Sequence, residues 1–212
     1  MSEPLRDRAV HKDVLERETV YHGMVWDITR DTVDLGDGGV VKREYMEHTG
    51  AVGILALDDD GRVAFVEQYR HPVGMMLWEL PAGLLDVDGE PPLDAAQREL
   101  AEEADLRAER WDVLIDWFNS PGGTTEALRL YLARGLSEVP EADRHEREAE
   151  EKGMAVRWVP LEQARDAVLA GALHNPGVVV GILAACEARA QEWRTLRPAD
   201  APWPEHPALR QG

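Results

Sequence analysis

The residues of this chain best suited to chemistry are three glutamates in the segment EPPLDAAQRELAEEADL, residues 90–106. Glu102 lies three positions and Glu103 four positions beyond Glu99, so a helix would place the three carboxylates along one face. Like charges at this spacing cost about 0.2–0.5 kcal/mol per pair on an isolated helix. A hard divalent cation, Mg²⁺ or Mn²⁺, would convert that repulsion into coordination because it prefers carboxylate oxygens. A solvated acidic helix face is the alternative, and the carboxylates alone do not decide between the two.

The surrounding residues resemble a known sequence pattern, the Nudix box, G-x5-E-x7-R-E-U-x-E-E-x-G-U, in which U is aliphatic. Seven residues separate Glu90 from Arg98, as the box requires, and RELAEE follows without a gap. The residues that match the box are Gly83, Glu90, Arg98, Glu99, Leu100, Glu102, Glu103 and Leu106. The chain therefore resembles the Nudix hydrolases.

The match departs from the box in two places. Six residues rather than five lie between Gly83 and Glu90, so the loop GLLDVDGE is one residue longer. Asp105 stands where the family has a glycine that ends the helix in a left-handed conformation. Asp tolerates that conformation at a modest cost in strain. Neither departure removes an expected metal ligand.

Further segments resemble the ADP-ribose pyrophosphatase branch of the family. The segments WELPAG, residues 78–83, and VEQYR, residues 66–70, are typical of that branch. Pro121 lies fifteen residues beyond Leu106, where the branch has a proline that marks a preference for ADP-ribose. The run Pro-Gly-Gly at this place is also explained by a simple turn between two strands.

The resemblance implies hydrolysis of the diphosphate bond of ADP-ribose to AMP and ribose 5-phosphate, with Mg²⁺ or Mn²⁺ as cofactor. Divalent ions suit this reaction because they activate a water molecule and polarise the phosphoryl group. The box indicates hydrolysis of a diphosphate but does not identify the sugar attached to it, so another nucleoside diphosphate sugar is an alternative substrate. A non-catalytic Nudix module that senses ADP-ribose is an alternative of a different class.

The resemblance also implies roles for individual residues of the box. The expected metal ligands are the carboxylates of Glu99, Glu102 and Glu103 and the backbone carbonyl of Ala82. Arg98 is expected to orient the glutamates through an ion pair, and Glu90 to support the loop.

The general base of this branch comes from a loop beyond the box. The acidic run EADRHEREAEEKGM, residues 141–154, is where that loop would lie. Glu150 and Glu151 are the expected catalytic residues, and Glu146 and Glu148 are alternatives in the same run. A solvated charged loop explains most of these acids equally well.

Two further residues are expected on the substrate side. Arg70 is a candidate phosphate ligand because a guanidinium binds diphosphate oxygens in a bidentate manner, and its alternative is a surface ion pair. Glu79 either contacts the substrate or pairs with an arginine. Three tryptophans could stack on adenine, although a tryptophan in a strand is commonly part of a core: Trp26, Trp78 and Trp117.

The elements that must position these residues alternate between strands and helices. Strands are expected at 18–21, 24–35, 40–48, 51–58, 62–70, 111–119, 126–133 and 154–159, and helices within 90–106 and at 160–171 and 178–193. The turn Asp58-Asp59-Asp60-Gly61 should join two of the strands into a hairpin. The order resembles the Nudix fold, an α/β/α sandwich with a mixed sheet, preceded by a small β-rich domain.

Three regions are expected along the chain. Residues 1–49 form a β-rich segment that would be marginal alone. Within it, residues 14–49 are similar to the β-domain through which the ADP-ribose pyrophosphatase branch dimerises, and a homodimer is therefore expected. Residues 50–193 form the Nudix hydrolase domain. Residues 194–212 are rich in proline and poor in apolar residues, which predicts a disordered or loosely docked tail.

Composition restricts the partners and the compartment. The formal net charge of −18 argues against binding of nucleic acid, so the expected partner is a small nucleoside diphosphate sugar. Apolar runs stay far shorter than the ~20 residues of a membrane helix, and the charged N-terminus does not resemble a secretory signal. The single cysteine, Cys186, cannot form an intrachain disulfide, which favours the cytoplasm.

Overall fold

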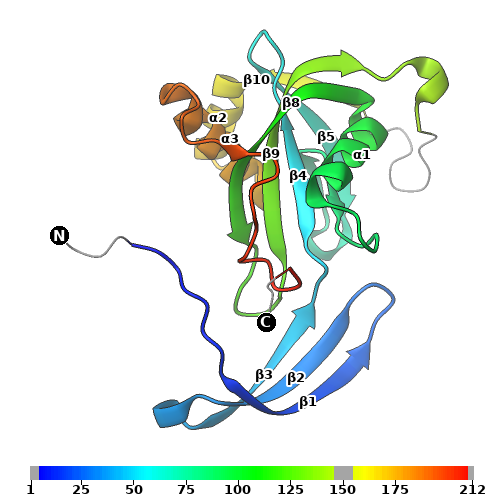
Figure 1. The fold of residues 1–212 in the computed structure, drawn as a ribbon. Coiled ribbons are helices and arrows are strands. Elements are labelled where there is room, and N and C mark those ends of the chain that lie inside the picture. The colour runs from blue at the N-terminus through cyan, green and yellow to red at the C-terminus, as the bar shows by residue number, and fades with distance from the viewer. Residues whose placement is uncertain (1–4, 146–154, 210–212) are drawn as a thin grey trace. The chain divides into compact units, whose positions relative to one another are not determined.

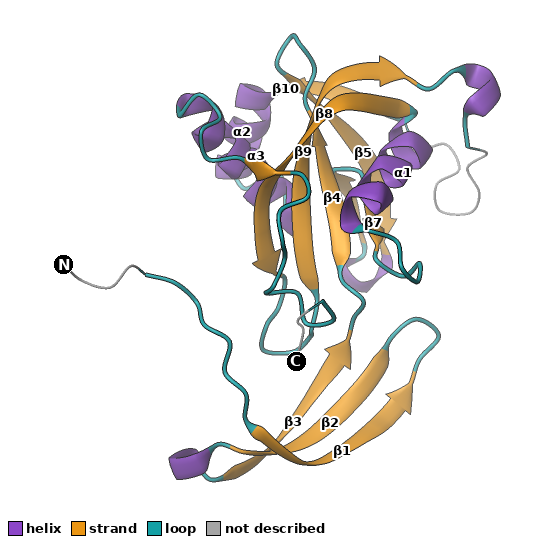
Figure 2. Cartoon of the chain, in the orientation of Figure 1, coloured by secondary structure: helices purple, strands orange, loops and turns teal. Residues whose placement is uncertain are grey.

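A computed structural model describes residues 5–145 and 155–209 of the chain. The chain divides into two compact units, coloured along the sequence in Figure 1 and by secondary structure in Figure 2. Unit 1 comprises residues 1–49, 120–126 and 203–212, and unit 2 comprises residues 50–119 and 127–202.

Unit 1 is built on an antiparallel sheet of three strands, β1 (Asp13–His22), β2 (Asp27–Asp34) and β3 (Val40–Glu47), in that order. A short 3₁₀ helix, η1 (Gly36–Gly38), lies between β2 and β3. Asp31 of β2 is buried and ties the three strands together. It accepts two hydrogen bonds of 2.8 Å from Arg17 of β1 and one of 3.0 Å from the hydroxyl of Tyr45 of β3.

Unit 2 contains a mixed five-stranded sheet in the order β11-β8-β9-β4-β7. Its strands are β4 (Ala51–Ala56), β7 (Ala82–Leu84), β8 (Leu106–Phe118), β9 (Ala127–Glu138) and β11 (Arg197–Pro198). The β4–β9 pair is parallel and the other pairs are antiparallel. A second, antiparallel sheet has the order β10-β5-β6, with β5 (Arg62–Arg70), β6 (Met75–Glu79) and β10 (Arg157–Pro160). The short helices η2 (His71–Val73) and η3 (Glu141–Asp143) complete the connections.

Three α-helices in the described part of unit 2 pack on opposite faces of the five-stranded sheet. Helix α1 (Pro92–Ala104) covers one face, and α2 (Leu161–Leu169) and α3 (Pro176–Ala190) lie on the other (Figure 1). Strand β4 shows why, since its side chains alternate: Val52 and Ile54 join the cluster under α1, whereas Leu55 joins the cluster under α3. The predicted α/β/α sandwich with a mixed sheet is confirmed. No helix within the described ranges is long and apolar enough to cross a membrane.

The hairpin predicted at 51–70 is only partly correct. The turn forms, because the N–H of Asp58 donates to the carbonyl of Arg62 at 2.9 Å and Leu57 bridges to Val63. Beyond this tip the two strands enter different sheets, β4 between β9 and β7 and β5 between β10 and β6. All six residues of β4 are buried, which is typical of a central strand paired on both edges.

Residues 197–202, part of the segment predicted to be a disordered or loosely docked tail, contact the five-stranded sheet. Strand β11 pairs with β8, and Arg197 donates to Asp116 at 2.8 Å. Arg129 of β9 is 2% exposed and donates to the carbonyl of Ala201 at 2.6 Å as well as to Asp116. A buried guanidinium requires hydrogen-bond acceptors. The backbone carbonyls of this segment provide them, so the segment is held by hydrogen bonds although it has few apolar side chains.

Candidate active site

Helix α1 carries most of the predicted site. Pro92 occupies its first turn, where the missing N–H of proline costs no hydrogen bond. A stripe of small and aliphatic residues packs into the core of unit 2: Ala95, Ala96, Leu100 and Ala104. This stripe fixes the rotation of the helix about its axis, so core packing determines the directions of the glutamates between these positions.

Both departures from the box are accommodated. Asp105 ends α1 with a left-handed φ of 54°, and its N–H donates to the carbonyl of Leu100. In the longer loop, the N–H of Glu90 donates to the carbonyl of Val87 at 3.1 Å, and Gly89 supplies a φ of 76°. Asp therefore takes the conformation expected of the family glycine, and the extra residue is absorbed in a turn.

Glu103 and Ala82 lie together. The carboxylate of Glu103 accepts a hydrogen bond of 2.9 Å from the N–H of Ala82, and Glu103 is 8% exposed. The sequence prediction concerned the carbonyl of Ala82, and it did not foresee this contact of its amide. The contact fixes a carboxylate of α1 against the first residue of β7.

Glu99 packs on the next residue of β7. A Cβ atom built at Gly83 would lie 2.1 Å from both Cδ and Oε1 of Glu99. Any residue other than glycine would therefore displace the Glu99 carboxylate. Two of the predicted ligands thus reach from one helix onto adjacent residues of one short strand.

Arg98 connects the glutamates of the helix with the preceding loop. It donates to Glu99 at 2.6 Å and to Glu102 at 3.0 Å, and it forms a two-pronged contact with Glu90 at 3.0 Å for each bond. The hydrogen bond with Arg98 holds the pKa of Glu90 below its usual value. The same contacts, led by that with Glu90, raise the pKa of Arg98, so this residue stays charged. The predicted ion pair is present.

A divalent cation fits these donors, although they are not arranged as a finished metal centre. Within residues 5–145 and 155–209, no three His, Cys, Asp or Glu side chains are gathered to hold a metal ion. Arg98 and the Ala82 amide engage the three glutamates instead. The donors are hard oxygens, and two of them lie over a short strand at which glycine leaves space, so the set suits Mg²⁺ or Mn²⁺.

Arg70 and Glu79, the two residues predicted on the substrate side, pair with each other. The guanidinium of Arg70 donates to both carboxylate oxygens of Glu79, at 2.8 and 2.7 Å, from the end of β5 to the end of β6. The side chain of Glu79 is 4% exposed and that of Arg70 is 44% exposed. For each residue, an ion pair is the alternative to substrate binding that the sequence predicts, and that ion pair is present. The guanidinium of Arg70 remains about half exposed.

The remaining predicted residues belong to other parts of the chain. Pro121 lies in the part of the chain that folds with unit 1, as does Trp26, which stacks on His48 at 4.3 Å. Trp78 lies beneath Arg157, whose guanidinium carbon is 5.2 Å from the ring centroid. Glu150 and Glu151, and the alternatives Glu146 and Glu148, lie outside the described residues.

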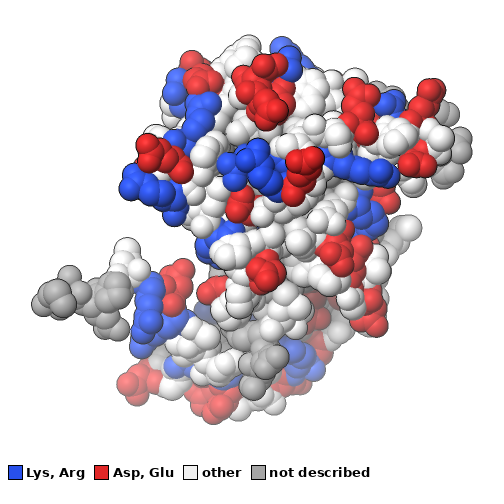
Figure 3. All heavy atoms as spheres, turned by 45° about the horizontal axis from the view of Figure 1, so that its top comes forward, with Lys and Arg blue, Asp and Glu red and all other residues white. Residues whose placement is uncertain are grey.

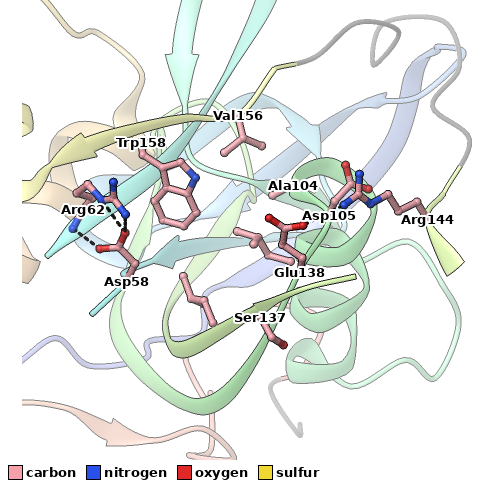
Figure 4. Close-up of a pocket in the computed structure, with 11 residues that line it drawn as sticks. Asp58, Arg62, Ala104, Asp105, Ser137, Glu138, Arg144, Val156 and Trp158 are labelled. Carbon is pink, nitrogen blue, oxygen red and sulfur yellow. Dashed lines mark hydrogen bonds and ion pairs between the residues drawn. The ribbon is translucent and has the colours of Figure 1, made fainter. Parts of the chain in front are cut away.

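A cavity of about 570 Å³ at the C-terminal end of α1 was not predicted (Figure 4). Asp105 and Glu138 line it, Trp158 and Val156 lie across from them, and Arg62 pairs with Asp58 at its rim. Its lining residues come from separate segments between 58 and 158, so no local sequence pattern could indicate it. Among the residues that the structure describes, none of the predicted site residues lines it.

Charge on the surface is mixed rather than uniformly acidic. In Figure 3, Lys and Arg side chains lie beside Asp and Glu side chains across the face shown. Several of the arginines are ion-paired, including Arg62 with Asp58 and Arg134 with Asp112. The net charge of −18 therefore coexists with guanidinium groups paired locally with carboxylates.

Comparison with known proteins decides the family. Residues 47–178 match the family model described as NUDIX domain. The chain belongs to the Nudix hydrolase family. The membership and hydrolase class predicted from the box are confirmed.

Relatives of this Nudix hydrolase carry different descriptions. An ADP-ribose pyrophosphatase of Mycobacterium tuberculosis is 44% identical over 195 residues, which cover 92% of each chain. A methanol dehydrogenase activator of Bacillus methanolicus is 38% identical over 128 residues, 60% of this chain and 69% of that protein. A crystal structure of an ADP compounds hydrolase superposes with a TM-score of 0.70 at 20% identity, covering 88% of this chain and 98% of the other. That likeness supports the fold.

Proposed function

We propose that this Nudix hydrolase cleaves the diphosphate bond of ADP-ribose with water, giving AMP and ribose 5-phosphate. The observation that carries the proposal is the 44% identity to the ADP-ribose pyrophosphatase of Mycobacterium tuberculosis over 92% of both chains. The aligned 195 residues exceed the extent of the family match at 47–178. The similarity therefore includes residues outside the region that all Nudix proteins share.

The residues that would hold the cation, Mg²⁺ or Mn²⁺, are Glu99, Glu102, Glu103 and the carbonyl of Ala82. When bound, the cation supplies charge neutralisation on the diphosphate and lowers the pKa of water. Arg98 holds two of the carboxylates in place, and the Ala82 amide holds the third. Glu150 or Glu151 takes the proton from the attacking water as the phosphorus–oxygen bond to the leaving phosphate breaks.

Arg70, Glu79 and Pro121 serve the substrate side. The two-pronged contact with Glu79 holds the guanidinium of Arg70 in one orientation, which suits a group that must meet diphosphate oxygens. Pro121 lies in the turn of residues 120–124, where it limits the conformations of the backbone.

Two alternatives remain as proposals, hydrolysis of another nucleoside diphosphate sugar and non-catalytic binding of ADP-ribose. The relative described as a methanol dehydrogenase activator, 38% identical to this chain, shows that not every similar protein is described as an ADP-ribose pyrophosphatase.

We further propose that residues 50–193 are the hydrolase domain, that residues 1–49 mediate a homodimer, and that the protein is cytoplasmic with no nucleic-acid partner. All ten residues of β1 are exposed, and β1 is an edge strand of its sheet. An exposed edge strand of this length presents unpaired backbone groups that a second copy can cover. The net charge of −18 disfavours phosphate backbones as ligands.

The substrate is tested with purified protein, Mg²⁺ and a panel of ADP-ribose, other nucleoside diphosphate sugars and diadenosine polyphosphates. Release of AMP and sugar phosphate from ADP-ribose in preference to the other compounds would support the proposal. Preference for another compound would retain the mechanism and change the substrate. Binding of ADP-ribose without turnover in excess Mg²⁺ would favour the non-catalytic module.

A further inference from the structure

Residues 120–126, SPGGTTE, leave the five-stranded sheet after β8 and re-enter it at β9, yet they fold as part of unit 1. The segment begins with a tight turn around Pro121. The N–H groups of Gly123 and Thr124 both donate to the carbonyl of Ser120, at 2.9 and 3.1 Å. A Cβ atom built at Gly122 or Gly123 would meet nothing within 4 Å, so close packing around these two glycines does not hold the turn. Hydrogen bonds within the turn and directly after it hold it instead.

The second half of the segment pairs with the end of β3. The N–H of Met46 donates to the carbonyl of Gly123 at 2.9 Å, and the carbonyl of Met46 accepts from the N–H of Thr125 at 3.0 Å. These two bonds make a parallel β-bridge between Met46 and Thr124. The pairing joins residues more than seventy positions apart in sequence. It anchors the turn directly after Pro121.

Thr125 and His48 extend this pairing with a reciprocal side-chain contact. The hydroxyl of Thr125 accepts from the N–H of His48 at 2.9 Å and donates to the carbonyl of His48 at 3.2 Å. The imidazole of His48 is 6% exposed, stacks on Trp26 at an interplanar angle of 15°, and lies 3.4 Å from a carboxylate oxygen of Glu126. His48 is thereby fixed on both sides, so its backbone is a rigid support for Thr125.

We propose that Thr125, supported by His48, is a positioning residue that fixes the Pro121 turn and thereby sets substrate selectivity. The proposal rests on the proposed function for the role of Pro121 on the substrate side. Thr125 acts through the backbone of residues 121–124 and not on the reacting atoms. Because one hydroxyl makes both contacts with His48, its removal breaks both, whereas serine retains them.

The first test is independent of activity and compares Thr125→Val with Thr125→Ser by hydrogen–deuterium exchange. Loss of hydrogen bonds of ordinary strength should speed exchange of the amides of residues 123–126 about tenfold in Thr125→Val and leave Thr125→Ser near wild type. Thr19→Val, the same change on exposed β1, is the control and should not alter this segment. Unchanged exchange of residues 123–126 in a folded Thr125→Val protein would overturn the proposal.

The second test measures KM and kcat for ADP-ribose and for a second nucleoside diphosphate sugar. A displaced turn should raise the KM of Thr125→Val for ADP-ribose about tenfold and change kcat less than about twofold, which reduces the preference between the two substrates. Thr125→Ser should restore the wild-type KM. An equal fall in kcat for both substrates with KM unchanged would contradict a positioning role.

Thr125→Ala provides a second variant if Thr125→Val does not fold, since it also removes the hydroxyl that makes both contacts with His48. It should shift exchange and KM in the same direction, and no shift in either would overturn the proposal. If wild-type protein fails to cleave ADP-ribose, the proposed function fails, and the exchange experiment still decides whether Thr125 fixes the turn.

Discussion

The carboxylate of Glu99 lies against the backbone of Gly83 so closely that a Cβ atom at residue 83 would be 2.1 Å from its Cδ atom. With the Glu99 side chain in this conformation, only glycine fits at residue 83. The neighbouring contact, between Glu103 and the amide of Ala82, is a hydrogen bond of 2.9 Å. Together they locate two proposed metal ligands relative to the sheet.

Gly83→Ala should displace Glu99 and impair both stability and activity. Insertion of one methyl group into a closely packed contact costs about 1–3 kcal/mol. Displacement of a reacting geometry by about 1 Å costs up to about a hundredfold in rate. Denaturant unfolding and kcat/KM measure the two effects.

A double-mutant cycle is the control for this substitution. In a Glu99→Ala background, the methyl group of Ala at residue 83 no longer meets the carboxylate, so the added loss of stability should vanish. An equal loss in both backgrounds would show that Glu99 is not the partner that requires Gly83.

Arg98→Lys should reduce kcat/KM about ten- to hundredfold, the range found when groups that orient metal ligands are lost. Lysine keeps the charge but cannot contact Glu90, Glu99 and Glu102 at once, because it lacks the planar guanidinium fork. Arg110→Lys, on the exposed part of β8, is the matched control and should retain activity. Full activity of Arg98→Lys would remove the positioning role.

The contact between Glu90 and Arg98 also predicts a loss of stability in acid. Arg98 holds the folded-state pKa of Glu90 below its usual value of 4.5. The unfolded chain therefore binds the proton more readily than the folded chain, so this contribution is full above about pH 4.5 and is lost as the pH falls through the folded-state pKa.

Thermal unfolding as a function of pH checks this expectation. Wild-type stability should fall more steeply than that of Glu90→Gln below about pH 4.5, whereas the exposed control Glu109→Gln should follow wild type. Identical slopes for wild type and Glu90→Gln would contradict it.

Substitutions in the ion pair of Arg70 and Glu79 distinguish its effect on stability from the effect of Arg70 on substrate binding. Arg70→Gln leaves the buried Glu79 carboxylate without its two-pronged partner, which should cost about 1–3 kcal/mol and raise KM. In the double variant Arg70→Gln with Glu79→Gln, both groups are neutral amides, so stability should recover while KM stays high. Recovery of KM together with stability would show that Arg70 serves only the ion pair.

The helical face that carries the candidate ligands could be predicted because its information is local. The spacing of Glu99, Glu102 and Glu103 determines one helix face, and the box places Gly83 at a fixed distance along the chain. The left-handed end at Asp105 also follows from local conformational preference. These features do not depend on contacts with segments that are distant in sequence.

The features that escaped prediction depend on distant contacts. The tail after Trp193 is anchored by Arg129, a buried guanidinium whose need for carbonyl acceptors appears only once β9 is placed in the sheet. The assignment of β4 and β5 to different sheets depends on partners elsewhere in the chain. Likewise, the pairing of residues 123–125 with Met46 has no sequence signal, since a Pro-Gly-Gly run fits any turn.

The most direct measurement of the central claim compares ADP-ribose turnover by wild type, Glu103→Gln and Glu109→Gln in excess Mg²⁺, with AMP and ribose 5-phosphate quantified together. We expect wild type and the Glu109→Gln control to release the two products in equal amounts. Glu103→Gln should lose at least about a hundredfold in kcat while still binding ADP-ribose. Turnover in Glu103→Gln at the wild-type rate would contradict the role of α1 as the metal-binding element of a hydrolase.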